Sequence, residues 1–426
     1  MQEKIIIVGA GFAGLHLAKQ LQNTHNEVML IDKHNYHQFQ PLFYQVATAR
    51  IEPSSISFPL RKVFQRSRNI SIRIAEVQHI DSAQQTLHTN IGPFNYTRLI
   101  IATGCTTNFF GNKAIEAHAF PMKSTPEALT LRNRILSNFE KALSAAPEEM
   151  EGIMNIVVVG GGPTGVELAG SLAEMKTKIL PKDYPDMDFS RLNIFLLEGS
   201  NTLLGPMSEV SRRKAKEYLE ALGVKVCLQT LVEAYDGHTI SLKGNGTIVS
   251  DNLIWAAGVS GNLIKGLEKA TIQRGNRIVV DRYNKVVGYD NIFAVGDIAF
   301  METPLYPNGH PQVANVAINQ GKLLAQNIKK YPGRPDSWKM FEYKDPGSMA
   351  TVGKRKAVVD LPSFSFQGRM AWFTWMFLHL MLILSVRNKL FIFINWAISY
   401  FTNDTTLRLI LHPSRRQVEL LDNQPE

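Results

Sequence analysis

Two short glycine-rich turns are the residues of this sequence with the clearest chemistry. The first reads Gly9-Ala10-Gly11-Phe12-Ala13-Gly14, and the second reads Gly160-Gly161-Gly162-Pro163-Thr164-Gly165. Gly9 and Gly160 allow a tight bend, and Gly11 and Gly162 let the backbone approach a pyrophosphate. Gly14 and Gly165 permit close helix–strand packing. The N–H groups that begin the next helix favour bound phosphate. Both turns therefore predict dinucleotide sites.

An acidic residue follows each turn, at the end of the next apolar strand. Asp32 lies 18 residues after Gly14, and Glu198 lies 33 residues after Gly165. A carboxylate at this place accepts hydrogen bonds from the ribose hydroxyls of a dinucleotide. We attribute the longer second spacing to an inserted loop at 176–191. Because a carboxylate repels the 2′-phosphate of NADPH, Glu198 favours NADH; the alternative is an acid that only caps a turn.

Strands and helices alternate around both turns, which predicts two βαβ units in one chain. A small β insertion is expected within 70–103, and a helix is expected over 125–146 and another over 313–330. The elements expected to position the two turns are strands at 4–8, 28–31, 156–159 and 193–197, and helices that begin after Gly14 and Gly165.

Two such folds suggest a relay in which one fold holds a flavin and the other brings NADH to it. The segment Ala102-Thr103-Gly104 closes one strand, and Gly296-Asp297 follows another. This arrangement resembles the flavoprotein reductases with two dinucleotide folds, which place FAD contacts here, the second through an Asp on the ribityl chain. The cofactor contacts expected beyond the two turns are Lys33, Thr103, Gly104, Ala257, Gly258, Gly296 and Asp297.

Length, charge and cysteine content limit the alternatives. The 426 residues are too many for one compact domain and suit two or three. A net charge of +9 fits a solvated basic surface or contact with an anionic partner. Cys105 and Cys227 form no CxxC pair, so we expect no metal site, disulfide framework or disulfide reductase. The N-terminus lacks the features of a signal peptide, so no export is expected.

The composition changes after a Pro-Gly boundary at 332–335. Residues 371–386 carry no formal charge, and at ~1.5 Å per residue they span roughly 24 Å, short of a ~30 Å bilayer core. Trp372, Trp375 and His379 share one helical face, where we expect the indoles to lie at a membrane–water interface. This segment therefore predicts a helix that lies on a membrane surface.

A second apolar stretch follows Arg387-Asn388-Lys389. Its apolar residues form one stripe, and Asn395, Ser399 and Thr402 lie opposite. From 363 to 416 six Lys or Arg residues stand against one acid, Asp404, which favours an anionic lipid interface. The alternatives are a buried dimer helix and one true membrane span. The stripe consists of Leu390, Phe391, Ile394, Ile398 and Phe401.

The motifs together resemble the type II NADH:quinone oxidoreductases, which are single-subunit, non-pumping respiratory dehydrogenases. The resemblance covers nearly the whole chain, and no single motif decides it. Its more specific parts are FQPLFYQVAT at 39–48, NFFG at 108–111, GGGPTGVELAG at 160–170 and the tail at 372–410. The resemblance implies FAD as cofactor, NADH as substrate and a membrane quinone, menaquinone or ubiquinone, as electron acceptor.

The resemblance also implies catalytic positions. Glu167 is expected near the nicotinamide and flavin rings, where a carboxylate can tune hydride transfer or deliver a proton; the alternative is a first-turn acid that suits the helix dipole. The family pattern A-Q-x-A-x-Q is here Ala314-Asn315-Val316-Ala317-Ile318-Asn319, followed by Gln320. Asn315 and Asn319 lie four residues apart on one helix face, so we expect these amides and Gln320 at the quinone. Incidental surface amides are the alternative.

The expected fold class is α/β: two Rossmann-like dinucleotide-binding domains, with the NADH domain inserted in a discontinuous FAD domain, plus a C-terminal amphipathic-helical membrane-association region. We expect a peripheral protein on the cytoplasmic face of the cell membrane, with no nucleic-acid partner, and a homodimer through the C-terminal region stays open. The expected ranges are 1–113 and 263–331 for FAD, 114–262 for NADH, and 332–426 for membrane association.

Other functions are compatible with part of this pattern. A soluble reductase of ferredoxin or rubredoxin would leave the apolar tail without a role. A sulfide:quinone reductase requires paired cysteines that this chain lacks. A non-catalytic FAD-binding membrane scaffold would not require two intact glycine turns. The leading interpretation is thus an enzyme that oxidises NADH through FAD and passes two electrons to a quinone.

Overall fold

The structure, a computed structural model, describes residues 2–332, 334–402 and 407–411. Asp404, Arg415 and Arg416 of the predicted basic tail lie outside the described residues. Contacts divide the chain into two compact units, which we describe separately. Unit 1 comprises Met1–Gln38, Ser57–Asn108 and Val259–Asp345, and unit 2 comprises Phe39–Ile56, Phe109–Gly258 and Pro346–Glu426. Compared with the expected ranges, residues 39–56 and the C-terminal segment lie within unit 2.

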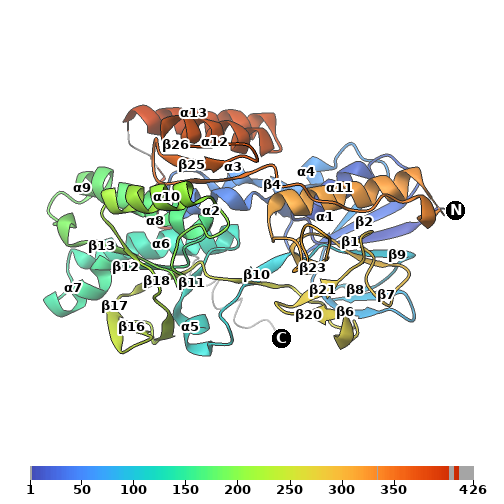
Figure 1. The fold of residues 1–426 in the computed structure, drawn as a ribbon, viewed down its shortest axis with the longest axis horizontal. Coiled ribbons are helices and arrows are strands. Elements are labelled where there is room, and N and C mark those ends of the chain that lie inside the picture. Colours follow the sequence, from blue (N-terminus) through green and yellow to red (C-terminus); the bar gives the residue numbers. More distant parts are fainter. Residues whose placement is uncertain (1, 333, 403–406, 412–426) are drawn as a thin grey trace. The chain divides into compact units, whose positions relative to one another are not determined.

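The core of unit 1 is a five-stranded parallel sheet in the order β22-β9-β1-β2-β5 (Figure 1). Its strands are short apolar runs rich in Ile, Val and Leu, the composition of parallel strands that are buried on both faces. Ile5, Ile6 and Ile7 at its centre are fully buried. The strands are β1 (Lys4–Val8), β2 (Glu27–Asp32), β5 (Ile70–Ile74), β9 (Arg98–Ile101) and β22 (Ile292–Ala294).

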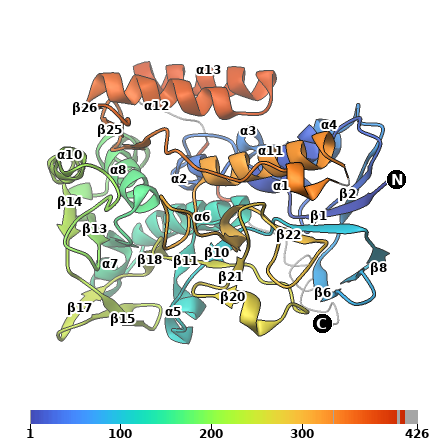
Figure 2. The same ribbon diagram turned by 45° about the vertical axis from the view of Figure 1, so that its right-hand side comes forward.

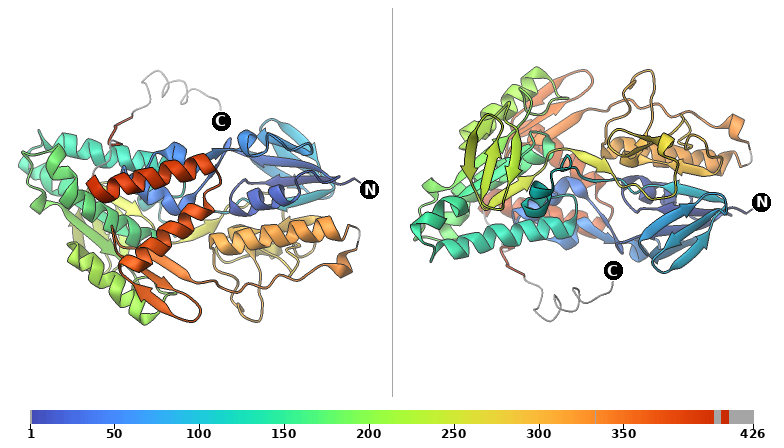
Figure 3. Two further views of the ribbon diagram at one scale, coloured as in Figure 1. Left: turned by 90° about the horizontal axis from the view of Figure 1, so that it is seen from above. Right: turned by 90° about the horizontal axis from the view of Figure 1, so that it is seen from below.

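Helices α1 (Phe12–Gln20) and α11 (Ala314–Lys330) lie side by side in unit 1 (Figure 3). Small residues allow this approach, because a Cβ atom at Gly321 would lie 2.4 Å from the carbonyl oxygen of Ala13. The predicted helix at 313–330 and the first βαβ unit are therefore confirmed.

The β insertion of unit 1 is shorter than predicted. Residues 70–74 form β5, which pairs in parallel with β2 in the main sheet, so the segment before the insertion belongs to the core. The insertion proper is the antiparallel sheet β6 (Val77–Asp81), β7 (Thr86–Thr89) and β8 (Gly92–Asn95). The smaller elements of unit 1 are β3 (Tyr36–Gln38), β4 (Ser57–Pro59), α4 (Leu60–Val63), β10 (Cys105–Thr107), β19 (Val259–Gly261), β20 (Ile272–Gln273), β21 (Arg277–Val279) and β23 (Ala299–Phe300).

Unit 2 repeats the architecture with a second five-stranded parallel sheet in the order β11-β18-β12-β13-β14. The strands are β11 (Phe120–Pro121), β12 (Asn155–Val159), β13 (Asn193–Leu197), β14 (Val224–Cys227) and β18 (Asn252–Trp255), and helices α6 (Thr125–Ala142), α8 (Pro163–Lys178) and α10 (Glu209–Ala221) accompany them. The predicted second βαβ unit is confirmed. The shorter helices are α2 (Phe43–Ala47), α3 (Pro53–Ile56), α5 (Lys113–His118), α7 (Pro147–Met154) and α9 (Leu180–Asp183).

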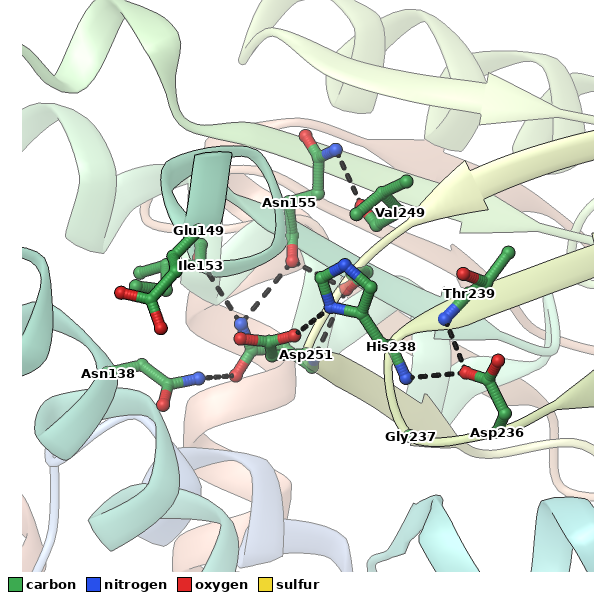
Figure 4. A network of polar contacts seen from close by, with 12 residues as sticks. Asn138, Glu149, Ile153, Asn155, Asp236, Gly237, His238, Thr239, Val249 and Asp251 are labelled. Carbon is green, nitrogen blue, oxygen red and sulfur yellow. Dashed lines mark hydrogen bonds and ion pairs between the residues drawn. The ribbon is translucent and has the colours of Figure 1, made fainter. Parts of the chain in front are cut away.

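A polar network joins the second sheet to the small sheet of β15 (Val232–Tyr235), β16 (Thr239–Leu242) and β17 (Gly246–Val249) (Figure 4). The Asn138 amide donates to Asn252 Oδ1 at 2.6 Å, and the Asn155 amide donates to the Val249 carbonyl at 2.8 Å. His238 Nδ1 lies 2.8 Å from Asp251 Oδ1. These bonds satisfy buried polar groups at the start of β12 and β18, where two parallel strands meet a hairpin.

The C-terminal segment of unit 2 forms a three-stranded antiparallel sheet followed by two helices (Figure 2). The strands are β24 (Ser348–Thr351), β25 (Ala357–Asp360) and β26 (Ser365–Gln367), and the helices are α12 (Arg369–Leu382) and α13 (Val386–Thr402). In the described part of the chain, none of the helices has the length and apolar character needed to cross a membrane.

The side chains of α12 face opposite to the prediction. Trp372 and Trp375 are 9% and 1% exposed, so the expectation that these indoles meet a membrane interface is wrong. Because α12 is apolar around most of its circumference, its sequence does not identify the inward face. The exposed face instead carries Phe373 and Phe377. In α13 the predicted stripe from Leu390 to Phe401 is exposed, as expected.

The close contact of α1 with α11 leads to a stability prediction. Gly321→Ala should lower the free energy of unfolding by about 1–3 kcal/mol, because the added methyl meets backbone atoms of Ala13 that cannot move aside. Gly205→Ala is the matched control, since its Cβ would meet nothing within 4 Å. Thermal unfolding monitored by fluorescence checks both variants. Equal melting temperatures for them would contradict the tight packing.

Candidate active site

The first glycine turn combines two crowded positions with one open position. A Cβ atom at Gly9 (φ +100°) would lie 2.3 Å from the carbonyl oxygen of Ala102, and one at Gly14 would lie 1.9 Å from the carbonyl oxygen of Gly9. Beside Gly11, in contrast, there is nothing within 4 Å. The turn therefore holds α1 against the sheet and leaves free backbone at its middle glycine. Phe12 and Ala13 form the first turn of α1.

The second turn has the same geometry in unit 2. A Cβ atom at Gly165 would again lie 1.9 Å from a carbonyl oxygen, that of Gly160 (φ +112°), and Gly162 again faces open space. Pro163 and Thr164 begin α8, where proline removes only an N–H that a helix start leaves unused. At both turns a pyrophosphate can reach the backbone where a side chain would otherwise stand, so the residues present fit a dinucleotide.

The two strand-end acids hold the turns in the same way. Asp32 accepts hydrogen bonds from the N–H of Ala10 at 2.6 Å and of His34 at 2.7 Å. Glu198 accepts from the N–H of Gly161 at 2.5 Å and of Ser200 at 2.7 Å. Burial raises the pKa of Asp32, and the two backbone hydrogen bonds oppose that shift. Each acid thus shapes its turn and keeps lone pairs for a ribose.

The carbonyl oxygen of Ala10, between Gly9 and Gly11, also accepts a hydrogen bond, which the sequence did not indicate. His37 Nδ1 donates to the carbonyl oxygen of Ala10 at 2.8 Å. Burial lowers the pKa of His37 to about 4, so the ring is a neutral donor at pH 7. In unit 2 the backbone N–H of Leu204 donates to the carbonyl oxygen of Gly161 at 2.8 Å. In each turn, the residue after the first glycine, Ala10 or Gly161, is therefore held through both its N–H and its carbonyl oxygen.

The other flavin positions expected in unit 1 lie just after the strands β2, β9 and β22. Thr103 Oγ1 donates to the carbonyl oxygen of Asn262 at 2.7 Å, and Cys105 Sγ donates to Asp297 Oδ2 at 3.0 Å. Gly104 (φ +67°) and Gly296 (φ +78°) adopt left-handed conformations that favour glycine. Lys33 is exposed beside Asp32.

The remaining nicotinamide positions lie in unit 2. Ala257 and Gly258 follow β18, and Ala257 lies against the second glycine turn, because its backbone nitrogen is 2.9 Å from where a Cβ of Gly160 would be. Gly258 (φ +73°) packs under the ring of Phe110. These positions are consistent with the expected loop beside the second glycine turn.

The three amides of α11 that were expected at the quinone have different surroundings. Asn319 is exposed and Asn315 is half-buried, as a surface for a ligand requires. Gln320 is 1% exposed, and its Oε1 accepts from the N–H of Gly296 at 2.7 Å. This bond gives Gln320 a role in holding the Gly296 loop, so it does not share the exposure of the two asparagines.

Glu167 lies in the first turns of α8, two residues after Gly165, and is 7% exposed. Its Oε1 accepts from the backbone N–H of Thr351 at 3.2 Å and from Thr351 Oγ1 at 3.5 Å. Thr351 Oγ1 lies 3.0 Å from the hydroxyl of Tyr44, to which the Gln45 amide also donates at 3.0 Å. The carboxyl group thus ends a chain of buried polar groups.

Burial raises the pKa of Glu167 to about 8, and the hydrogen bonds from Thr351 only partly oppose this shift. The indole N–H of Trp375 has no hydrogen-bond acceptor among the described residues, yet it lies near enough to lower the same pKa slightly. At pH 7 the carboxyl is therefore mostly protonated and can donate a proton. Tyr44 lies in the FQPLFYQVAT motif, but nothing in the sequence pointed to Thr351, which is 184 residues away from Glu167.

Known proteins resemble this chain both in sequence and in fold. A family model described as pyridine nucleotide-disulphide oxidoreductase matches residues 3–321, and one described as NDH2 C-terminal domain matches residues 346–403. A type II NADH:quinone oxidoreductase, Ndh, of Mycobacterium tuberculosis is 35% identical over 418 residues, which cover 94% of this chain and 89% of that protein. The Staphylococcus aureus type II NADH:quinone oxidoreductase is 29% identical, covering 84% and 89%.

Solved structures show the same fold. The structure of NDH2 from Plasmodium falciparum in complex with NADH has a TM-score of 0.88 at 22% identity and covers 97% of this chain and all of that chain. The sulfide:quinone oxidoreductase of Aquifex aeolicus has a TM-score of 0.72 at 19% identity over 96% of each chain. With the paired glycine turns, their strand-end acids and the near full-length match to curated relatives, the chain belongs to the type II NADH:quinone oxidoreductases.

Proposed function

We propose that this chain oxidises NADH and reduces a membrane quinone, with FAD resident at the first glycine turn. Membership in the type II NADH:quinone oxidoreductases supports this activity. The single observation that carries it is the repeated turn, open at Gly11 and at Gly162, because one chain then has places for two dinucleotides. When bound, FAD accepts a hydride from NADH and passes two electrons to the quinone.

One set of residues binds FAD, and a second set binds NADH. Gly11 and the N-terminus of α1 face the FAD pyrophosphate, Asp32 takes the adenosine ribose, and Asp297 takes the ribityl chain. In unit 2 Gly162 and Glu198 take the corresponding parts of NADH. The carboxylate of Glu198 excludes the 2′-phosphate of NADPH by charge repulsion.

The quinone end uses side chains rather than backbone. Asn315 and Asn319 are amides on α11 that reach the surface of unit 1 and match the family's glutamine positions, so they are our candidates for the quinone carbonyls. Glu167 supplies a proton, because its carboxyl is buried and mostly protonated at neutral pH. Gln320 acts indirectly, through its bond to Gly296.

The exposed face of α12 and α13 supports attachment to a membrane surface, which we place on the cytoplasmic side. Large apolar side chains are exposed along both helices, and Arg369, Arg387 and Lys389 flank them. Such a face inserts into the headgroup region, while the basic residues attract anionic lipid. A homodimer through this region stays a prediction. The exposed apolar residues are Met370, Phe373, Phe377, Leu378, Met381, Leu382, Val386, Leu390, Phe391, Phe393, Ile394, Ile398 and Phe401.

The function predicts two separable half-reactions. NADH should bleach the bound flavin without oxygen, and an added quinone should restore its absorbance. Asn315→Gln and Asn319→Gln should change only the second step, by about 2- to 10-fold, since a hydrogen bond of this kind contributes roughly 0.5–1.5 kcal/mol. Stopped-flow absorbance measures both steps. Flavin that NADH reduces but no quinone reoxidises would instead indicate a reductase of a protein carrier.

Glu198 should determine the choice of nucleotide. Wild-type protein should prefer NADH, and Glu198→Gln should narrow the NADH-to-NADPH ratio of kcat/KM at least about 5-fold, because a charge repulsion of ~1–4 kcal/mol is lost. Glutamine keeps an oxygen for the N–H of Gly161, so the turn should keep its shape. Steady-state kinetics with NADH and NADPH checks the ratio. Equal use of both nucleotides by the wild type would remove this role.

Membrane attachment should depend on the exposed face of the two helices. Phe377→Asp combined with Phe391→Asp should weaken binding to phosphatidylglycerol vesicles at least 10-fold, because two apolar anchors become charged. Leu305→Asp, at an equally exposed site in unit 1, is the matched control and should bind normally. Co-sedimentation with vesicles measures the binding. Unchanged binding of the double variant would place the membrane contact elsewhere.

A further inference from the structure

A directional chain of hydrogen bonds leads from α13 to Glu167. Trp396 Nε1 donates to Gln45 Oε1 at 2.8 Å, and this contact fixes the orientation of the Gln45 amide. The Gln45 Nε2 group therefore donates to the Tyr44 oxygen, which turns the Tyr44 hydrogen toward Thr351 Oγ1. Thr351 in turn donates to Glu167. Two hydroxyl groups, both able to donate and accept, thus stand in series before the carboxyl.

A small cavity borders these two hydroxyls and lies within unit 2. Its volume is about 40 Å³, and because a buried water needs roughly 10–15 Å³ of such space, it can hold about three or four waters. Its lining includes Tyr44 and Thr351 but not Glu167. Thr351 lines the cavity and also donates to Glu167, so its hydroxyl and that of Tyr44 offer a hydrogen-bonded path for a proton from cavity water to the carboxyl. The polar lining is completed by Gln45, Arg50, Ser171, Lys354 and Ser399.

The proton balance of the reaction explains what these hydrogen-bonded hydroxyl groups can do. The hydride of NADH carries two electrons and one proton, so reduction of a quinone to a quinol takes up one further proton from the medium. Resting on the function proposed above, Glu167 gives that proton to the quinone and becomes a carboxylate. A carboxylate that is 7% exposed and has no direct contact with the cavity must then be reprotonated before the next turnover.

We propose that Thr351 and Tyr44 form a proton relay that reloads Glu167 from water in the cavity. The Thr351 hydroxyl gives its proton to the Glu167 carboxylate and receives one from Tyr44, whose proton is replaced by a cavity water. That water regains its proton from the solvent, so one proton enters for each quinol formed. Gln45 is a positioning residue, because it keeps the Tyr44 hydrogen aimed along the chain.

Other charged groups near the relay already have partners of their own. Across the cavity, Arg50 pairs with Glu174, and Glu174 also accepts from the backbone N–H of Lys354. The Lys354 ammonium donates to the carbonyl oxygens of Ser399 and Tyr400 in α13. From α12, His379 stacks on Trp375 at 4.0 Å, and burial lowers the pKa of its ring to about 4, so it is neutral. Burial also raises the pKa of Tyr44, which therefore passes protons without losing its own.

The relay is tested by separating the first turnover from later ones. In Tyr44→Phe and in Thr351→Val, Glu167 still carries its resident proton, so a single reoxidation of reduced flavin by quinone should match wild type. Steady-state turnover should fall at least 10-fold and show a larger solvent isotope effect. Thr351→Ser restores the hydroxyl and should restore the rate. Tyr235→Phe, which removes another buried tyrosine hydroxyl of unit 2, is the matched control.

The pH dependence has a defined sign. Because the pKa of Glu167 is about 8, its proton-loaded fraction falls as the pH rises through that value, and the first reoxidation should slow in parallel. Glu167→Gln should remove this dependence together with most of the activity. A first reoxidation that does not change between pH 6 and 9.5 would overturn the role of Glu167 itself.

A readout without turnover uses infrared spectroscopy of the FAD-loaded protein. The carboxyl stretch of Glu167, identified by its loss in Glu167→Gln, should shift rapidly on mixing with D₂O in wild type and Thr351→Ser. Exchange should slow at least 10-fold in Tyr44→Phe and Thr351→Val. If Tyr44→Phe and Thr351→Val both exchange and turn over at the wild-type rates, the relay is overturned and the proposed function still stands. Wild-type protein that transfers no electrons from NADH to quinone would overturn the function itself.

Discussion

The structure depends on the absence of a side chain at the last glycine of each turn, Gly14 and Gly165. At Gly14 and at Gly165 even one methyl group would lie within 2 Å of a backbone oxygen, so no other residue lets the helix start so close to the strand. That closeness brings the helix N-terminus and the middle glycine to one place. The acids at the strand ends then bond to the same peptide, so the sheet, the turn and the helix become one rigid cradle.

This cradle and the buried carboxyl of Glu167 are linked along one helix. Glu167 lies two residues after Gly165, so the turn that we propose for a nucleotide also sets the position of the proposed proton donor. The rest of its surroundings come from segments far apart in the chain: Tyr44 from α2, Thr351 from β24 and Trp375 from α12. Unit 2 therefore holds the proposed nucleotide turn and the buried carboxyl within one core.

Sequence patterns predicted much of this architecture because they report local geometry. The two turns, the acids Asp32 and Glu198, and the helix on which Asn315 and Asn319 lie follow from spacing and periodicity, and the resemblance supplied Glu167. The contacts of Thr351 and the inward face of Trp375 could not be predicted, because they arise from packing between distant segments. Residues 371–386 are apolar on nearly all sides, so periodicity could not show which side is buried.

The two cradles differ in the group that donates a hydrogen bond to the carbonyl oxygen of the residue after the first glycine, which is Ala10 in unit 1 and Gly161 in unit 2. In unit 1 that group is the imidazole of His37, a side chain that a single codon change can remove. In unit 2 it is the backbone N–H of Leu204, which every amino acid except proline supplies. Although the turns look alike, they should thus tolerate sequence drift differently: variation around the first is restricted at residue 37, whereas residue 204 is restricted mainly by its left-handed backbone (φ 49°) and by burial.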